Sequence, residues 1–164
     1  MGLDITAYEH FEMQDIDTSE MTDEQEDDLY EQYTRVYPTF PDQAEGLDGW
    51  VTTSGKEIGF RAGSYSGYNH WRRTLSEMAY GHGPDTLWEH PEDWKGKPFF
   101  ELINFSDAEG IIGPKTSAKL AKDFRDNREK AMRFAEDNDY FGSLYDQWEE
   151  AFTLAADSGF VKFH

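Results

Sequence analysis

The residues best suited to chemistry lie between positions 57 and 73, where arginine, tyrosine, serine and glycine are concentrated. Arginine carries a planar fork of donors that matches phosphate or carboxylate, and aromatic rings offer flat faces to a nucleobase. Serine hydroxyls and glycine amides near a helix start can hold an anion. This pattern predicts a pocket for a small nucleotide-like ligand. The predicted ligand-binding residues here are Arg61, Ser64, Tyr65, Ser66, Tyr68, Trp71 and Arg72.

The alternative for this stretch is structural. Arg61 could pair with one of the many acids, and the tyrosines could line the edge of the core. The stretch matches no phosphate-binding fingerprint such as a Walker loop, so its composition alone does not separate the two interpretations.

A second polar stretch, residues 104–114, contributes Asn104, Asp107 and Glu109 to the predicted pocket. The two acids could accept hydrogen bonds from ribose hydroxyls or amines, and in an enzyme they could act as a general base or bind magnesium. An Asx-type turn that caps the following helix would use the same residue types. One shared pocket requires that segments 57–73 and 104–114 meet in space.

The chain lacks the residues or spacings that several kinds of catalytic and metal site require. The chain has no cysteine, which excludes thiolate nucleophiles, disulfides and cysteine-type zinc sites. No two of its five histidines have the i, i+4 spacing of a zinc helix, and Ser64 and Ser66 lie outside a Gly-x-Ser-x-Gly elbow. We therefore assign no catalytic residue, metal or cofactor, and binding is favoured over catalysis.

Hydrophobic spacing predicts a single α+β domain over residues 1–164, with a small, mostly antiparallel sheet packed against two long C-terminal helices. A strand is expected at 2–8, a hairpin of strands 50–53 and 56–61 turning at Ser54-Gly55, and a closing strand at 160–163 that pairs with the first. Gly159 is expected to cap the last helix. The predicted helical segments are 22–33, 68–80, 98–105, 114–135 and 140–157.

Charge is distributed unevenly. The chain carries a net charge of −19, and residues 1–50 hold fifteen acids against the single base Arg35. An acidic, insertion-like segment at about 9–48 would repel nucleic acid and could mimic it toward a basic protein, or it could serve solubility alone. The basic residues between 115 and 133 could dock on such a segment in the same chain or a second subunit, which would make a homo-oligomer.

No apolar run approaches the roughly 18 residues that a membrane helix needs, and no leader peptide opens the chain. Together with the absence of cysteine, this favours a soluble cytoplasmic protein with no membrane partner.

Three motifs resemble those of a family of mostly uncharacterised phage and prophage proteins. The chain opens on Met-Gly-Leu-Asp-Ile-Thr-Ala-Tyr, reads Phe-Arg-Ala-Gly-Ser-Tyr-Ser-Gly-Tyr at 60–68, and has Ile-Asn-Phe-Ser-Asp-Ala-Glu-Gly-Ile-Ile-Gly-Pro at 103–114. The C-terminal residues Phe163-His164 also match the family, whereas residues 9–50 and 81–97 are particular to this chain. The resemblance implies a phage protein that acts in the cytoplasm of an infected bacterial host.

These observations lead to three hypotheses for function. The first is a nucleotide-binding protein that sequesters an immune signal of the host, an anti-defence sponge. The second is an enzyme that modifies or hydrolyses such a molecule through Asp107 or Glu109. The third is an acidic inhibitor of a protein partner, or a DNA mimic, acting through the segment 9–48.

Overall fold

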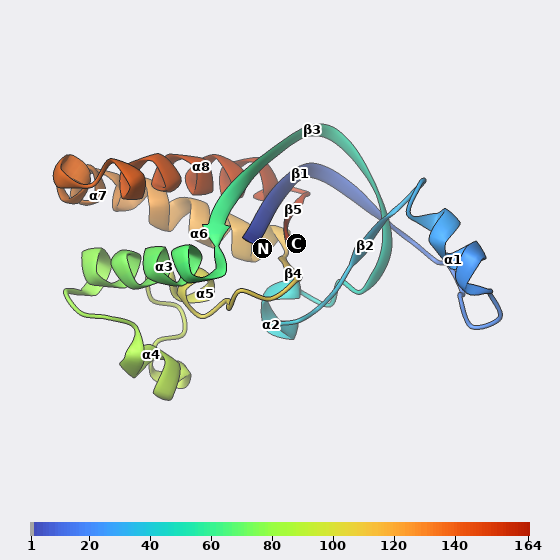
Figure 1. Cartoon of the computed structure of the whole chain (residues 1–164), viewed down its shortest axis with the longest axis horizontal. Coiled ribbons are helices and arrows are strands. Elements are labelled where there is room, and N and C mark those ends of the chain that lie inside the picture. The colour runs from blue at the N-terminus through green and yellow to red at the C-terminus, as the bar shows by residue number, and fades with distance from the viewer. Residues whose placement is uncertain (1) are drawn as a thin grey trace.

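A computed structural model describes residues 2–164, and it confirms the α+β class (Figure 1). Five antiparallel strands form one curled sheet in the order β2-β3-β1-β5-β4. The strands are β1 (Gly2–Gln14), β2 (Thr34–Val36), β3 (Gly49–Ser64), β4 (Gly110–Ile112) and β5 (Phe160–Phe163). β5 lies between β1 and β4, so the predicted pairing of the closing strand with the first strand is confirmed.

The long helices gather on one side of the sheet, whereas α1 lies at the far end of the strands (Figure 1). The long ones are α3 (Tyr65–Tyr80), α6 (Pro114–Asp126) and α8 (Asp139–Ala155). The shorter ones are α1 (Asp23–Leu29), α2 (Pro41–Ala44), α4 (Asp85–Glu89), α5 (Phe100–Ile103), α7 (Arg128–Phe134), and the 3-10 turns η1 (Pro91–Asp93) and η2 (Ala135–Asp137).

The main core lies between the sheet and α3, α6 and α8, and aromatic rings fill much of it. Leu3, Ile5 and Ala7 alternate along β1 and are buried, as the period of two predicts. The Trp71 ring stacks between Phe141 and Trp148, with centroid separations of 5.7 and 6.0 Å. A smaller cluster on the opposite face of the sheet contains Val36, Ala44, Val51, Ile111 and Phe160.

The predicted hairpin at Ser54-Gly55 is wrong, because β3 runs through these residues as one strand paired with β1. Tyr8 pairs with Glu57 and His10 pairs with Ser54, so two residues of β3 face the single residue Glu9. This is a β-bulge, and Gly55 adopts the φ of +77° that one bulge type requires. A glycine that favours a turn favours this bulge equally, and only the pairing partner distinguishes the two.

Helix boundaries also differ from expectation. The predicted helix 114–135 breaks at Asn127, whose side-chain amide donates to the Asp123 carbonyl at 2.8 Å and competes with the helical pattern. Ala156, rather than Gly159, caps α8. Gly159 lies so close to β1 that a Cβ there would stand 1.7 Å from the Tyr8 carbonyl oxygen, so close approach explains this glycine.

Three further elements have different lengths from those predicted. β1 continues to Gln14, well beyond residue 8, because β3 supplies partners along its whole length. α1 and α5 are shorter than the segments 22–33 and 98–105. Among residues 2–164, none of the helices has both the length and the apolar character to cross a lipid bilayer.

Candidate functional site

The first part of the predicted binding stretch lies where β3 meets α3. The Arg61 guanidinium is half exposed and ion-pairs with Asp4 across the β1–β3 ladder, Nη1 to Oδ2 3.1 Å. Ser64 is the N-cap of α3, its Oγ accepting from the Gly67 amide at 3.0 Å and lying 3.2 Å from the Ser66 Oγ. The Tyr65 ring is exposed. Local ion pairing and capping therefore occupy most of the polar groups here.

Tyr68 and Trp71 belong to the core rather than to a surface pocket. Both side chains are buried; the Tyr68 hydroxyl donates to the Phe105 carbonyl at 2.7 Å, and the Trp71 indole donates to the Phe141 carbonyl. Burial raises the pKa of Tyr68. The α3 face that carries these rings points toward α8, so a ligand could not stack on them without opening the core.

Arg72 joins the two predicted segments. It is 6% exposed, and its Nη1 donates to the carbonyls of Ile103 and Phe105 at 2.9 and 2.8 Å. Its guanidinium lies 5.0 Å from the Tyr68 ring centroid and 5.1 Å from that of Trp88. Burial lowers the pKa of Arg72, and the charge of Asp107 opposes this. Segments 57–73 and 104–114 thus meet, and the contact between them is a buried structural clamp.

The polar residues of segment 104–114 face different surroundings. Asn104 ends α5 and borders a cavity next to α2. The negative charge of Asp107 favours the protonated form of Arg72. The charge of the exposed Glu109 favours the protonated forms of Lys162, in β5, and of His164, which follows β5. The ten predicted site residues are therefore spread over several surfaces and the core.

One groove does follow the predicted stretch. Asn69, His70, Arg72, Arg73 and Trp88 line an open cavity of about 480 Å³ on α3 and α4. Arg73 pairs with Asp85 at 3.2 Å, Nη1 to Oδ2, and the Nε of Arg72 is buried without a hydrogen-bond partner. The groove offers cationic and aromatic groups, although its two guanidinium groups already have protein partners.

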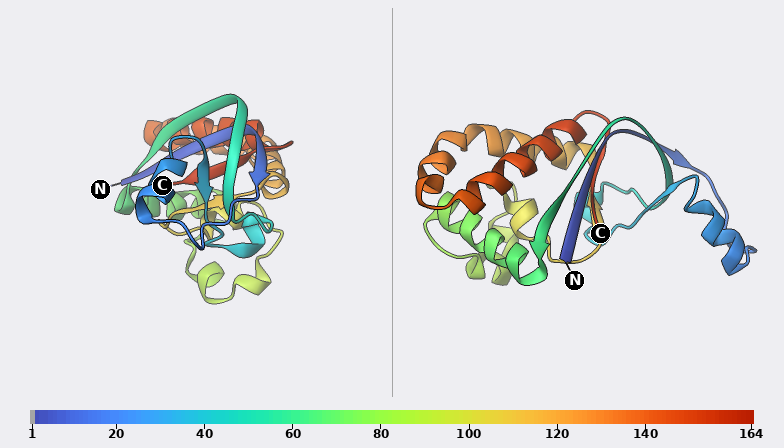
Figure 2. Two further views of the ribbon diagram at one scale, coloured as in Figure 1. Left: turned by 90° about the vertical axis from the view of Figure 1, so that its right-hand side faces the viewer. Right: turned by 45° about the horizontal axis from the view of Figure 1, so that its top comes forward.

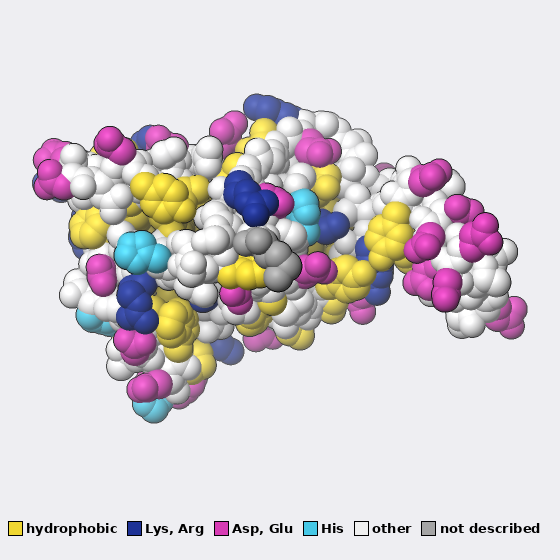
Figure 3. All heavy atoms as spheres, viewed as in Figure 1, with side chains coloured by type: hydrophobic (Ala, Val, Ile, Leu, Met, Phe, Trp, Pro, Cys, Tyr) yellow, Lys and Arg dark blue, Asp and Glu magenta, His cyan; other side chains and the backbone are white. Residues whose placement is uncertain are grey.

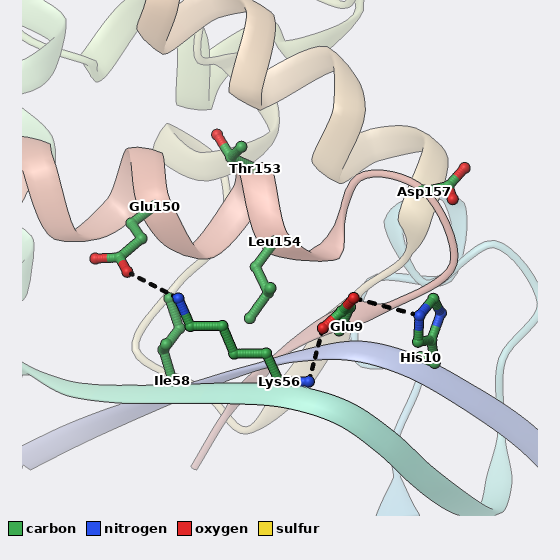
Figure 4. A pocket seen from close by; sticks show the side chains of 8 residues that line it. All are labelled: Glu9, His10, Lys56, Ile58, Glu150, Thr153, Leu154 and Asp157. Carbon is green, nitrogen blue, oxygen red and sulfur yellow. Dashed lines mark hydrogen bonds and ion pairs between the residues drawn. The ribbon is translucent and has the colours of Figure 1, made fainter.

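A second cavity lies at the β3 bulge, beside the C-terminal half of α8 (Figure 4). The Glu9 carboxylate accepts from the Lys56 amide at 2.7 Å through Oε2, and its Oε1 lies 3.4 Å from His10 Nε2. His10 Nδ1 hydrogen-bonds the Ser158 hydroxyl, which ties the end of α8 to the bulge. The cavity measures about 420 Å³, and its other lining residues are Ile58, Glu150, Thr153, Leu154 and Asp157.

Sequence reasoning missed this group because Glu9, Lys56 and Ser158 are distant in the chain. The bulge aligns them, since an extra β3 residue turns the Lys56 amide toward Glu9. The only signal was the adjacent pair Glu9-His10 within an alternating strand, and that pair has no meaning until the register is known.

A third cavity, about 460 Å³ in volume, separates α2 from η1 and α5. Phe40, Pro41, Pro91 and Phe100 give it apolar walls, and Gln43, Glu101 and Asn104 add polar groups. Of these, the sequence had singled out only Asn104. Gln43 and Glu101 carried no recognisable motif.

The acidic arm, which we define as residues 12–33, extends beyond the helices at the far end of β1 and β3 (Figures 1 and 2). It contains ten Asp and Glu residues and no Lys or Arg. Acidic side chains gather on its visible face (Figure 3). Within residues 2–164, none of these ten carboxylates ion-pairs with a basic side chain.

The arm is nevertheless ordered by local interactions. Thr22 and Gln25 form a reciprocal capping box at the start of α1, and the Tyr30 ring packs edge-on against Trp50 at 4.8 Å between centroids. Arg35, at the base of the arm, lies over the Tyr37 ring and pairs with Asp48 at 3.0 Å. None of the α1 residues is buried.

In the part of the chain that the structure describes, no group of three or more metal-ligating side chains could hold an ion. Comparison with protein-family models, with curated proteins and with solved structures finds no match to this chain. The arm and the cavities are therefore the features from which a function can be inferred.

Proposed function

We propose that this protein binds a basic surface of a protein partner through its acidic arm, in the manner of an inhibitor that takes the place of nucleic acid. One observation carries the proposal: α1 is a capped helix of acidic residues without a single buried one, and it lies at the end of a long strand pair (Figure 1). The phage context suggested by the sequence motifs agrees with a role against a host protein in the bacterial cytoplasm.

The charge arrangement of α1 is difficult to explain by the stability of the free protein. Its first-turn acids Asp23, Glu24 and Glu26 complement the helix dipole, but its last turn has no basic residue. Asp27 and Asp28 lie near the C-terminal end, where negative charge costs about 0.3–1 kcal/mol per residue at low salt. A positively charged partner surface would reverse that cost and would be attracted from a distance.

The experiment compares two matched triple variants in affinity capture from bacterial lysate. Each replaces two exposed glutamates by glutamine and one exposed aspartate by asparagine. The arm variant is Glu24→Gln, Asp28→Asn and Glu31→Gln, and the control is Glu129→Gln, Glu136→Gln and Asp137→Asn.

We expect wild type and control to retain the same basic nucleic-acid-binding protein, and the arm variant to lose it. Duplex DNA should compete for that partner. The Kd of the purified complex between this protein and the partner should increase steeply with added NaCl. Equal retention by all three proteins, or a captured partner that DNA does not displace, would contradict the proposal.

A second candidate function is the binding of a nucleotide-like ligand, for which the groove at Arg72, Arg73 and Trp88 is the supporting observation. A thermal-shift screen against linear and cyclic nucleotides tests it with Arg73→Gln, because Arg72 has a structural role. A ligand at about a hundred times its Kd adds about 2.7 kcal/mol to stability. A shift that Arg73→Gln removes and Arg61→Ala retains supports this function. An intact ligand on release indicates sequestration, and a changed one indicates an enzyme.

A further inference from the structure

Two residues that line the cavity between α2 and α5 each carry a buried side-chain oxygen without a hydrogen-bond partner. Gln43 is 6% exposed; its Nε2 donates to the Glu101 backbone carbonyl at 3.0 Å, and its backbone carbonyl accepts from the Gly113 amide at 2.8 Å. The first of these bonds fixes the orientation of the side-chain amide. The remaining atom, Gln43 Oε1, is buried without a partner.

Glu101 supplies the second unused acceptor. Its side chain is 13% exposed, and its Oε1 lies 2.5 Å from Lys119 Nζ, while Oε2 is buried and unpartnered. Lys119 also contacts Asp123 at 2.8 Å and the Lys97 carbonyl at 2.5 Å, so its donors are committed elsewhere. Burial raises the pKa of Glu101 against the effect of Lys119. An unpartnered buried acceptor is rare in native proteins and calls for an explanation.

Both acceptors belong to residues that line the same cavity of about 460 Å³. The terminal torsions of Gln and Glu side chains are broad, so a donor bound in that space can reorient both groups at the cost of the Gln43 Nε2 bond to the Glu101 carbonyl. Phe40 and Phe100 add flat apolar walls. At the rim, Asp42 and Lys95 form an exposed ion pair of 3.6 Å between α2 and the loop after η1. Exposed pairs of this kind are weak, so the rim can open at little cost.

We propose that this cavity binds an alkylguanidinium group. Guanidinium is planar, fits between apolar faces and presents several N–H donors in one plane, which suits a carboxylate oxygen and an amide oxygen together. It carries positive charge, which the net charge of −19 attracts. Neither the acidic arm nor the groove at Trp88 contributes to this site, so the inference is independent of the proposed function.

The test is a titration of the ¹⁵N-labelled full-length protein with agmatine, followed by two-dimensional NMR. We expect the Gln43 side-chain amide signal and the backbone signals of α2 and α5 to shift together in a saturable way. A parallel titration with blocked arginine amide shows whether the guanidinium group can belong to an arginine side chain of a peptide as well as to a free small molecule. Butylamine, which lacks the planar fork, should bind at least tenfold more weakly.

Gln43→Met and Glu101→Gln each remove one acceptor at nearly constant volume, and each should raise the Kd for agmatine at least tenfold. Glu129→Gln, an exposed acid on α7, removes one charge elsewhere and should leave the Kd unchanged. Absence of saturable shifts in wild type, shifts centred outside this cavity, or equal affinity for butylamine would each overturn the proposal. The positions of the shifted NMR signals in the wild-type protein test the proposal even if a variant folds poorly.

Discussion

Arg61 and Arg72 contribute differently to the stability of the fold because one is exposed and the other is buried. Removing the Arg61 side chain breaks one exposed ion pair with Asp4, and such pairs contribute about 0–1 kcal/mol. Removing that of Arg72 breaks two buried hydrogen bonds from a charged donor, to the carbonyls of Ile103 and Phe105, and such bonds contribute about 1.5–3 kcal/mol each. Trp88 and Tyr68 remain as donors to these carbonyls. We expect Arg72→Ala to lower the urea midpoint strongly and Arg61→Ala to lower it slightly. Equal midpoints would contradict the clamp.

His164 gives the protein a pH dependence at the same scale. Burial and the neighbouring Lys162 lower the pKa of His164, and its Nε2 lies 2.9 Å from the Thr6 hydroxyl. Folding therefore favours the neutral ring. The contribution of His164 to the free energy of unfolding is fully present above the ordinary histidine pKa of about 6.5, and it is lost as the pH falls below that value. Urea melts at pH 8 and pH 5 should show a smaller loss for His164→Gln than for wild type. His90→Gln, at an exposed site, should behave as wild type does.

The bulge is the element that curves β3 and brings Glu9 to Lys56, and Gly55 is its most sensitive residue. A Cβ at Gly55 would meet Glu9 Oε2 at 2.9 Å and His10 Cδ2 at 3.0 Å, on a backbone with φ of +77°. Gly81 has nearly the same φ, +80°, with no atom within 4 Å of an added Cβ. The backbone strain of about 1 kcal/mol is common to both sites.

We therefore expect Gly55→Ala to destabilise the protein by more than Gly81→Ala, by about 1 kcal/mol or more for crowding. Chemical denaturation of the two variants measures the difference. If both cost the same, Glu9 and His10 move aside freely and the bulge does not hold them in place.

At the scale of the whole molecule, charge repulsion opposes folding. The net charge of −19 is concentrated in the first fifty residues, where the arm acids have no basic neighbours in the arm. Salt shortens the range of this repulsion, with a Debye length of about 10 Å at 0.1 M. We expect the melting temperature to rise by about 2–4 °C between 20 and 300 mM NaCl, which corresponds to roughly 1 kcal/mol.

The triple variants defined above provide the control for this prediction. Neutralising Glu24, Asp28 and Glu31 should reduce the salt-dependent rise, because it removes repelling charges. Neutralising the three acids in and after α7 should not reduce it, since Glu129 pairs with Arg133 and the segment 128–133 also carries Arg128 and Lys130. A melting temperature that falls with salt in wild type would show that attractive pairs outweigh repulsion.

The sequence by itself determined those features that depend on neighbouring residues. The alternation of Leu3, Ile5 and Ala7, the α3 stripe of Trp71, Leu75 and Met78, and the Thr22 cap were readable because burial and capping repeat at fixed spacing. The α+β class followed from these periods, and the acidic segment followed from counting charges.

Only the tertiary structure decided what depends on long-range pairing. Whether Gly55 makes a turn or a bulge depends on β1, and whether Arg72 faces a ligand or two carbonyls depends on where residues 103–105 return. Gln43 and Glu101 likewise meet at one cavity only when α2 packs beside α5. Residue type sets what a group can bind, but the partner it meets is set by contacts between distant segments, which local spacing does not encode.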